Sequence, residues 1–263
     1  MPDIVVLEWT YSPTDFFEEA ITMEHEDYEM KIDGGRVEAR MHPDIYDKRP
    51  TMRNDLHEAL DYRFLSNQLL AHKPYNLSKS SESRLHEDGR RDVRVFAESV
   101  LLTCVGLSVD IQVKDKDGNI KTDTRKERLD RNKEMASLVE KHRSKDGLLG
   151  SLLKSYSHAV TNPENELVHL YEIHEALKTR FGKKKAPTEL GVGEEWSTLQ
   201  RLADDEPLRQ GRHRGRNAES LRDATEAELK EARGIARGLI EGYLRYLERA
   251  GEPKNASAAS SHD

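Results

Sequence analysis

The sequence predicts an α+β protein in which an N-terminal antiparallel sheet module with a helix is followed by a C-terminal all-α helical bundle. Two observations predict this fold. Apolar residues alternate with polar ones over much of the first 120 residues, which is the period of a half-buried strand. From about Thr122 they recur every three or four residues, as in an amphipathic helix. We therefore expect an α+β module over residues 1–121, a helical bundle over 122–250 and a disordered tail over 251–263.

The sheet module is predicted from a hairpin centred on Gly34 and Gly35. Apolar and charged residues alternate before and after this pair, and glycine reaches the positive φ of a tight turn at low cost. The outward-facing residues are mainly acidic before the turn and mainly arginines after it, which favours pairing across the strands. The other elements expected here are a strand over 4–11, a helix over 52–64 capped by Thr51, and two strands over 93–113 broken near Cys104.

The helical bundle is predicted from capping residues and from the helical spacing of apolar residues. A polar helix is expected over 124–143 and an apolar one over 148–160. Residues 162–164 (Asn-Pro-Glu) combine a side-chain cap, a proline at the first position and an acid at the positive end of the helix dipole, so they predict a helix that ends at Gly182. There follow a loop over 183–193, a short helix over 194–203 and a final helix that begins with a capping box of Thr225 and Glu228.

The composition excludes several classes of protein. There are 42 Lys and Arg against 49 Asp and Glu, a net charge of −7, so bulk charge gives no reason to expect nucleic-acid binding. No apolar run reaches the roughly 18 residues of a membrane-spanning helix, and the first residues do not read as a signal peptide. The single cysteine, Cys104, can form neither an internal disulfide nor a thiolate metal cage. We therefore expect a reduced, cytoplasmic protein that does not enter a membrane.

The most unusual segment is the basic connector, residues 209–216, which reads Arg-Gln-Gly-Arg-His-Arg-Gly-Arg and contains no acid. We expect it to link the short helix to the final helix, and its two glycines let the backbone turn. Arginine binds phosphate with two parallel hydrogen bonds and histidine titrates near neutral pH, so the segment suits a phosphodiester. The sequence leaves open the alternative of a solvated loop that pairs with the nearby acids Asp204, Asp205, Glu206 and Asp223.

A second candidate lies on the helix that ends at Gly182. Glu166 and His169 are three residues apart, the spacing used by di-iron helical bundles, but such a site needs a second Glu-x-x-His helix and two further glutamates. His174 shares a face with apolar residues and is expected to point inward, either as a core histidine with one hydrogen bond or as a supporting member of a site near the connector. No dinucleotide, phosphate-loop or nucleophile-elbow motif occurs, so we expect neither a metal nor a cofactor.

Residues 162–247 resemble a HEPN domain, the helical family named for nucleotide binding in higher eukaryotes and prokaryotes. The resemblance rests on the order of a capped helix reading Glu-Leu-Val-His-Leu-Tyr-Glu-Ile-His, a loop, a short helix ending Arg-Leu-Ala-Asp-Asp, residues 209–213 and a long closing helix. It covers about a third of the chain, and the two-part layout is similar to that of other bacterial proteins. Active HEPN members are metal-independent ribonucleases of toxin–antitoxin and phage-defence systems, in which an Arg and a His four to six residues apart meet across a dimer. Here three residues separate Arg209 from His213.

The resemblance implies an RNA-directed protein whose active form is a metal-independent endoribonuclease of a bacterial defence or toxin system. His213 would be the general base or acid at the ribose 2′-hydroxyl, Arg209 and Arg212 would hold the scissile phosphate, and Arg214 and Arg216 would bind neighbouring phosphates. The expected partners are RNA, a second copy of the chain docked through the helical bundle, and a protein bound by the N-terminal module. The alternative is a non-enzymatic interaction or scaffold protein with a helical dimerisation domain.

Overall fold

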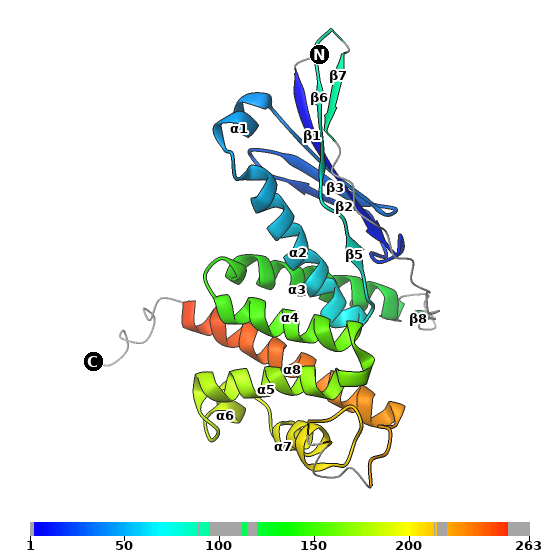
Figure 1. Cartoon of the computed structure of the whole chain (residues 1–263), viewed down its shortest axis with the longest axis vertical. Coiled ribbons are helices and arrows are strands. Elements are labelled where there is room, and N and C mark those ends of the chain that lie inside the picture. The colour runs from blue at the N-terminus through cyan, green and yellow to red at the C-terminus, as the bar shows by residue number, and fades with distance from the viewer. Residues whose placement is uncertain are drawn as a thin grey trace, which may run out of the picture. The chain divides into compact units, whose positions relative to one another are not determined.

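The chain forms two units that together give an α+β protein. The contacts divide it into Met1–Ala136 and Ser137–Asp263, and each unit is described here by itself. The first contains an antiparallel sheet with helices and the second is helical, which confirms the predicted fold class (Figure 1). The computed structural model describes residues 3–88, 90–94, 112–114, 120–212, 214 and 220–251.

The division between the units falls inside α3 (Thr124–Arg143), whereas the change of period placed it between residues 121 and 122. The first half of α3 belongs to the sheet unit because its side chains interact with that unit. Arg128 Nε is 2.5 Å from Glu18 Oε1, and Lys133 Nζ is 2.9 Å from Glu19 Oε1. A change of period therefore marks where a helix begins, but not which unit the helix packs against.

The sheet of the first unit is antiparallel, with the strand order β2-β3-β4-β1-β6-β7 and with β5 paired to β1. Strand β1 is central, and its inward-facing residues Leu7 and Trp9 are buried. The predicted strand over 4–11 is therefore present. The strands are β1 (Ile4–Ser12), β2 (Ile21–Glu24), β3 (Glu29–Asp33), β4 (Arg36–Met41), β5 (Asn76–Leu77), β6 (Ser81–Leu85) and β7 (Arg91–Arg94).

The hairpin predicted at Gly34 and Gly35 connects β3 to β4. Both glycines have positive φ, +53° and +90°, as a tight turn of this kind requires. Ile32 lies opposite Val37 in the register, and both are buried in the core. The register places opposite charges across the two strands, as predicted: Glu29 lies opposite Arg40, Lys31 opposite Glu38 and Asp33 opposite Arg36. The ion pairs themselves join other partners, since Lys31 pairs with Asp33, Arg40 with Glu38 and Arg36 with Glu8.

Helix α2 (Met52–Ala71) provides the helical part of this core. Its apolar residues, including Phe64, are buried in one cluster with residues of the sheet. The helix continues past the predicted end at residue 64 because buried residues such as Leu69 follow. Thr51 precedes the helix as predicted, but its side chain does not cap it: Thr51 Oγ1 instead donates a hydrogen bond to Asp55 Oδ2 at 3.1 Å.

Helix α1 (Pro43–Lys48) has no counterpart in the sequence analysis. His42 caps its N-terminus, because His42 Nδ1 accepts a hydrogen bond from the backbone nitrogen of Asp44 at 3.2 Å. Pro43 occupies the first helical position. None of its six residues is fully buried. The apolar spacing that reveals longer helices is therefore missing from its sequence.

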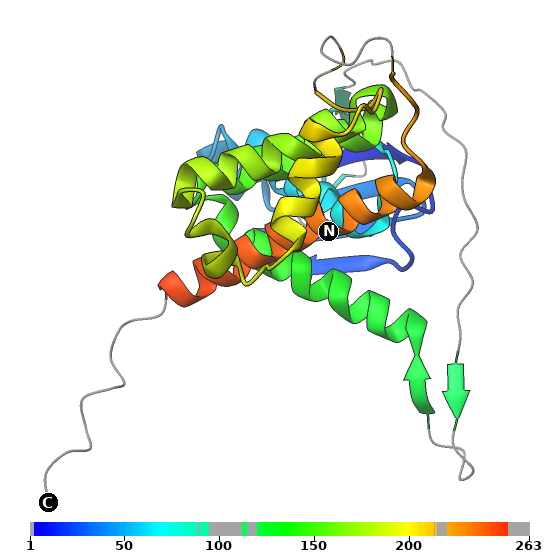
Figure 2. The same ribbon diagram turned by 90° about the horizontal axis from the view of Figure 1, so that it is seen from below.

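The strands expected over 93–113 are only partly described. Strand β7 ends at Arg94, and residues 95–111, including the predicted break near Cys104, lie outside the described residues. A separate two-stranded sheet of β8 (Gln112–Lys114) and β9 (Ile120–Asp123) leads directly into α3 (Figure 2). Within the described part of the chain no strand follows β9, so the helical character expected from residue 124 onward is confirmed.

The second unit packs its helices around a core that includes Leu152, Leu170, Leu239 and Tyr243, all buried. Helix α5 contacts both α4 and α8, which brings the beginning and the end of the unit together (Figures 1 and 2). Besides the end of α3, the elements are α4 (Gly147–Thr161), the 3-10 turn η1 (Pro163–Asn165), α5 (Glu166–Phe181), α6 (Ala186–Leu190), α7 (Glu195–Gln200), the π-helical turn η2 (Arg201–Asp205) and α8 (Glu226–Gly251).

The prediction that the Asn162 side chain caps α5 is wrong. Asn162 does not cap this helix with its side chain; its Oδ1 accepts a hydrogen bond from Asn165 Nδ2 at 3.1 Å. The 3-10 turn η1 intervenes, and α5 begins at Glu166. The Asn-Pro-Glu segment therefore marks the start of the 3-10 turn η1, and α5 begins only after this turn.

The predicted loop over 183–193 contains the short helix α6. This helix packs closely on α8, where a Cβ atom added to Gly242 would lie 2.5 Å from the carbonyl oxygen of Leu190. Gly242 is therefore required by the approach of a backbone that is distant in sequence. The same contact explains why α6 forms, because it is stabilised by packing rather than by its own length.

The end of α5 and the start of α8 lie where the sequence predicted them. Helix α5 ends at Gly182, which has a φ of +81°. Helix α8 begins with the predicted capping box: Glu228 Oε2 accepts from the Thr225 backbone nitrogen at 2.8 Å, and Thr225 Oγ1 accepts from the Glu228 nitrogen at 3.2 Å. No described helix is long and apolar enough to cross a membrane. The predicted tail, apart from Gly251, lies outside the described residues.

Candidate functional site

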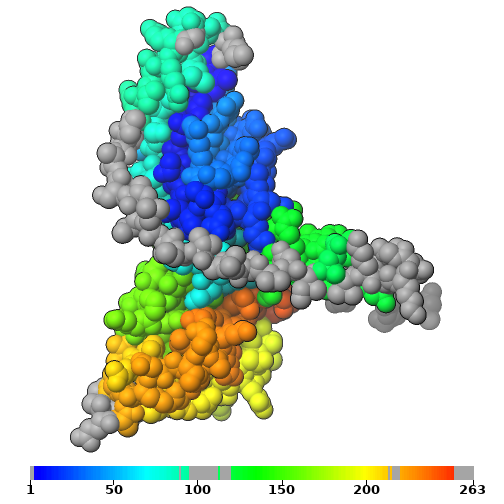
Figure 3. All heavy atoms as spheres, turned by 90° about the vertical axis from the view of Figure 1, so that its right-hand side faces the viewer, coloured from blue at the N-terminus to red at the C-terminus, as the bar shows by residue number. Residues whose placement is uncertain are grey.

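The first half of the basic connector is held in place by its backbone. Leu208, which precedes it, is buried and forms a bridge to Arg222, and the Arg209 nitrogen donates to the Arg222 carbonyl at 3.0 Å. Arg212 donates from its backbone nitrogen to the carbonyl of Ala203 at 2.9 Å. The segments on either side of the connector thus lie together on the surface of the helical unit, drawn yellow to orange in Figure 3. This part of the connector is a packed loop.

Gly211 is the residue that allows this packing. A Cβ atom at this position would lie 3.0 Å from the Ala203 carbonyl oxygen and 3.2 Å from the Leu208 carbonyl oxygen. The glycine was expected because it lets a backbone turn, but the structure gives a different reason, the close approach of two carbonyl groups. The second glycine of the connector, Gly215, lies outside the described residues.

Arg209 and Arg212 hold their side chains at the surface with loose partners. Arg209 Nε is 3.8 Å from Asp223 Oδ1, and the Arg209 side chain is 63% exposed. Arg212 Nη1 is also 3.8 Å from a carboxylate, that of Asp204, and this side chain is 41% exposed. The guanidinium carbon of Arg212 lies 4.8 Å from the ring centre of Tyr171, so a cation–π contact orients it.

Arg214 has a different environment. Its Nη2 donates to the carbonyl oxygen of Glu164 at 2.9 Å and to Asn165 Oδ1 at 2.6 Å, and its Nε donates to the Gly211 carbonyl at 3.1 Å. The two bonds of Nη2 tie the connector to the turn before α5, so Arg214 acts here as an anchor. The other two predicted members, His213 and Arg216, lie outside the described residues.

His174 is buried, as predicted, and 1% exposed. Its ring stacks on Tyr171 with centroids 5.0 Å apart and lies 3.9 Å from the ring of Trp196. The expected single hydrogen bond is missing: neither ring nitrogen has a hydrogen-bond partner among the described residues, and Nδ1 is 3.6 Å from Glu175 Oε1. Burial lowers the pKa of His174 to about 4, so the ring is uncharged near neutral pH.

Tyr171 links the predicted residues, since its ring contacts both Arg212 and His174. Burial raises the pKa of Tyr171, and its bond to the carboxylate of Glu175 acts in the same direction. Among the predicted site residues that the structure describes, only Arg212 and His174 share a neighbour, while Arg209 and Arg214 interact elsewhere. Sequence reasoning missed Tyr171 and Trp196. The one available signal for Tyr171 was its position three residues before His174 on α5.

The metal motif considered on α5 serves a structural purpose. Glu166 is 2% exposed and binds Arg233 of α8 with two hydrogen bonds of 2.5 and 2.9 Å. His169 lies 3.3 Å from Glu172 instead. In the described part of the chain no three histidine, cysteine or acidic residues gather as a metal site would require.

No protein-family model, curated protein or solved structure matches this chain. The resemblance to HEPN domains therefore stays a prediction that rests on the order of the helices and on the basic connector. The described residues of the connector provide two exposed guanidinium groups on an anchored backbone. One of them, that of Arg212, lies on the Tyr171 ring, which also stacks on the buried, uncharged His174.

Proposed function

We propose that the helical unit is a HEPN-like RNA-binding module that contacts RNA phosphates through Arg209 and Arg212. The observation that carries this proposal is the contrast between an anchored backbone and loosely held side chains. The Arg209–Asp223 contact is an exposed surface ion pair, which contributes about 0–1 kcal/mol, so a phosphate can replace Asp223 at little cost. The backbone of residues 209–212 is already held in place, which reduces the entropy lost on binding.

Cleavage of the bound RNA is a further part of the proposal, implied by the resemblance. His213 would move a proton at the ribose 2′-hydroxyl while Arg209 and Arg212 hold the phosphate, with no metal ion required. His174 supports this arrangement indirectly, because it packs on the same Tyr171 ring that orients Arg212. Being uncharged and buried, it is a packing residue rather than a proton donor.

A second candidate function is a non-enzymatic interaction module. The observation that favours it is that carboxylates lie beside both exposed arginines, as expected for a basic loop that merely pairs with local acids. Other acids of the region are similarly used: Glu206 lies 2.8 Å from Arg201 and 3.7 Å from Arg222. The two candidates differ in one measurable property, salt-dependent binding of RNA.

The test measures binding of the full chain to a fluorescently labelled single-stranded RNA by anisotropy over a range of salt concentrations. The double variant Arg209→Ala/Arg212→Ala should lower the slope of log K against log salt by about 1.4, because each phosphate contact contributes about 0.7 for a single strand. Arg245→Ala is the matched control, since this α8 side chain is 70% exposed and 4.0 Å from its carboxylate partner. Its salt slope should equal that of the wild type.

Three outcomes distinguish the candidates. Weaker binding with the lower salt slope in the double variant, and wild-type binding in Arg245→Ala, support the RNA-binding module. Release of shorter RNA fragments in EDTA, abolished by His213→Ala with binding retained, supports the nuclease. An absence of salt-dependent binding in the wild type overturns the proposal and leaves the interaction module.

A further inference from the structure

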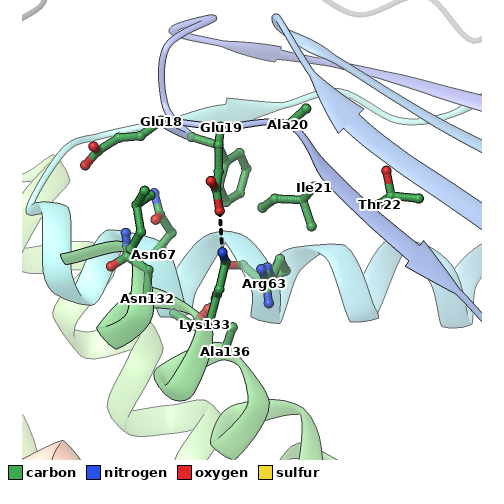
Figure 4. Close-up of a pocket in the computed structure, with 13 residues that line it drawn as sticks. Glu18, Glu19, Ala20, Ile21, Thr22, Arg63, Asn67, Asn132, Lys133 and Ala136 are labelled. Carbon is green, nitrogen blue, oxygen red and sulfur yellow. Dashed lines mark hydrogen bonds and ion pairs between the residues drawn. The ribbon is translucent and has the colours of Figure 1, made fainter. Parts of the chain in front are cut away.

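The sheet unit contains a cavity that the proposed function does not use. Its volume is about 350 Å³, at the small end of the range for small-molecule pockets. The segment leading into β2, the second half of α2 and the first half of α3 surround it (Figure 4). These segments are far apart in the sequence but belong to one unit. The cavity is therefore a product of the tertiary fold of that unit.

An ion pair crosses this cavity. Glu19 extends from the segment before β2 and Lys133 from α3, and their charged atoms meet at 2.9 Å (Figure 4). The two side chains are 36% and 60% exposed, so solvent reaches the pair and weakens it. A positive and a negative group thus stand on opposite walls, where a ligand of complementary charge can separate them.

The remaining walls carry polar and apolar side chains, together with the charged residues Glu18 and Arg63. Asn67 and Asn132 lie to one side of the ion pair (Figure 4). Asn132 Oδ1 is buried and has no hydrogen-bond partner among the described residues, so this acceptor lacks a donor. A buried acceptor without a donor is unfavourable, and a ligand N–H group would satisfy it once the Asn132 amide turns toward the cavity. Three half-buried apolar side chains also line the space: Phe17, Ile21 and Leu129.

We propose that this cavity binds a free α-amino acid with an apolar side chain. The ligand carboxylate replaces Glu19 as the partner of Lys133, and the ligand ammonium group donates to Glu19 and to Asn132 Oδ1. The ligand side chain packs on Phe17 and Ile21. A zwitterion satisfies both members of the opened ion pair together with the unpartnered acceptor, whereas a simple carboxylate has no donor for Glu19 and a simple amine has no partner for Lys133.

The ligand class is tested by isothermal titration calorimetry of the full chain with L-leucine and L-phenylalanine at millimolar concentrations. Saturable heat is expected for at least one of them. Two analogues of leucine probe its charges: isoamylamine lacks the carboxylate and 4-methylpentanoate lacks the ammonium group. Neither analogue should bind comparably. If 4-methylpentanoate binds as tightly as leucine, or neither amino acid binds, the proposal is overturned.

The site is tested with variants on α3. Lys133→Gln and Asn132→Leu should each weaken binding about tenfold, since each removes one polar contact to a charged group of the ligand. Lys126→Gln is the matched control, because it makes the same change on the same helix at a residue that does not line the cavity. Circular dichroism verifies that each variant folds. Equal affinity of Lys133→Gln and the wild type would place the ligand elsewhere, whatever the outcome of the RNA-binding test.

Discussion

The ion pair between Glu166 and Arg233 joins the first turn of α5 to α8, and its removal gives the most direct test of how the helical unit is held together. The contact is bidentate, with bonds of 2.5 and 2.9 Å, and Glu166 is 2% exposed. The Arg233 side chain is 22% exposed, and its bonds to Glu166 raise its pKa. The arginine is therefore charged at every pH at which the protein folds.

Arg233→Met keeps most of the side-chain volume and removes the charge, so Glu166 loses both bonds while it remains buried. Breaking a buried pair by removing one partner costs about 3–5 kcal/mol. We expect a smaller cost, about 2–3 kcal/mol, because Arg233 is partly solvated and Glu166 is stabilised by its place at the positive end of α5. Adding Glu166→Gln should recover at least about 1 kcal/mol, because the buried negative charge is then gone.

The assay is urea unfolding followed by tryptophan fluorescence. The chain has two tryptophans, one in each unit, so a Trp9→Phe background leaves Trp196 as a reporter of the helical unit. Arg245→Met on the same helix is the control and should change the free energy of unfolding by less than about 0.5 kcal/mol. A cost below about 1 kcal/mol for Arg233→Met, or strictly additive effects in the double variant, would refute this reasoning.

Three further predictions concern α5, the connector and α8. His174→Phe should stabilise the protein by about 1 kcal/mol at pH 7, because it removes two ring nitrogens buried without hydrogen bonds. Since the pKa of His174 falls from 6.5 to about 4 on folding, the wild type should lose stability as the pH falls between these values, and urea unfolding should show a smaller loss for the variant. Gly211→Ala should lower the thermal midpoint, since its Cβ would meet two carbonyl oxygens; an unchanged midpoint would contradict the packed connector. The bonds from Arg222 and Thr225 lower the pKa of Glu228 from 4.5 to about 2, so its contribution is present above pH 4.5 and lost as the pH falls toward 2; a Glu228→Gln variant that unfolds with the same pH dependence would argue against it.

The candidate site could be predicted only as a list of residue types. The sequence identified the basic connector because four arginines without an acid stand out in an acidic chain. It could not show that Arg214 binds backbone carbonyls while Arg209 and Arg212 remain exposed, because those environments depend on α5 and on residues beyond the connector. Helical spacing predicted that His174 points inward. It could not predict that the rings of Tyr171 and Trp196 lie against the imidazole.

The sequence by itself determined the features that are encoded locally. The turn at Gly34 and Gly35, the end of α5 at Gly182 and the capping box of Thr225 and Glu228 each involve residues within a few positions of one another, so backbone preference and nearby hydrogen bonds are sufficient to form them. The alternation of apolar residues in the first 120 residues and their helical spacing afterwards likewise determined the α+β class.

Only the tertiary structure decided which unit each half of α3 joins, why Gly242 and Gly211 are glycines, and where Glu19 meets Lys133. Each of these depends on contacts between segments that the sequence separates by several to more than a hundred residues. Such contacts form only when apolar burial brings whole elements together, and no spacing rule within one element specifies the partner. Packing between distant elements also accounts for the short helix α6, in which the Leu190 carbonyl lies against Gly242 of α8.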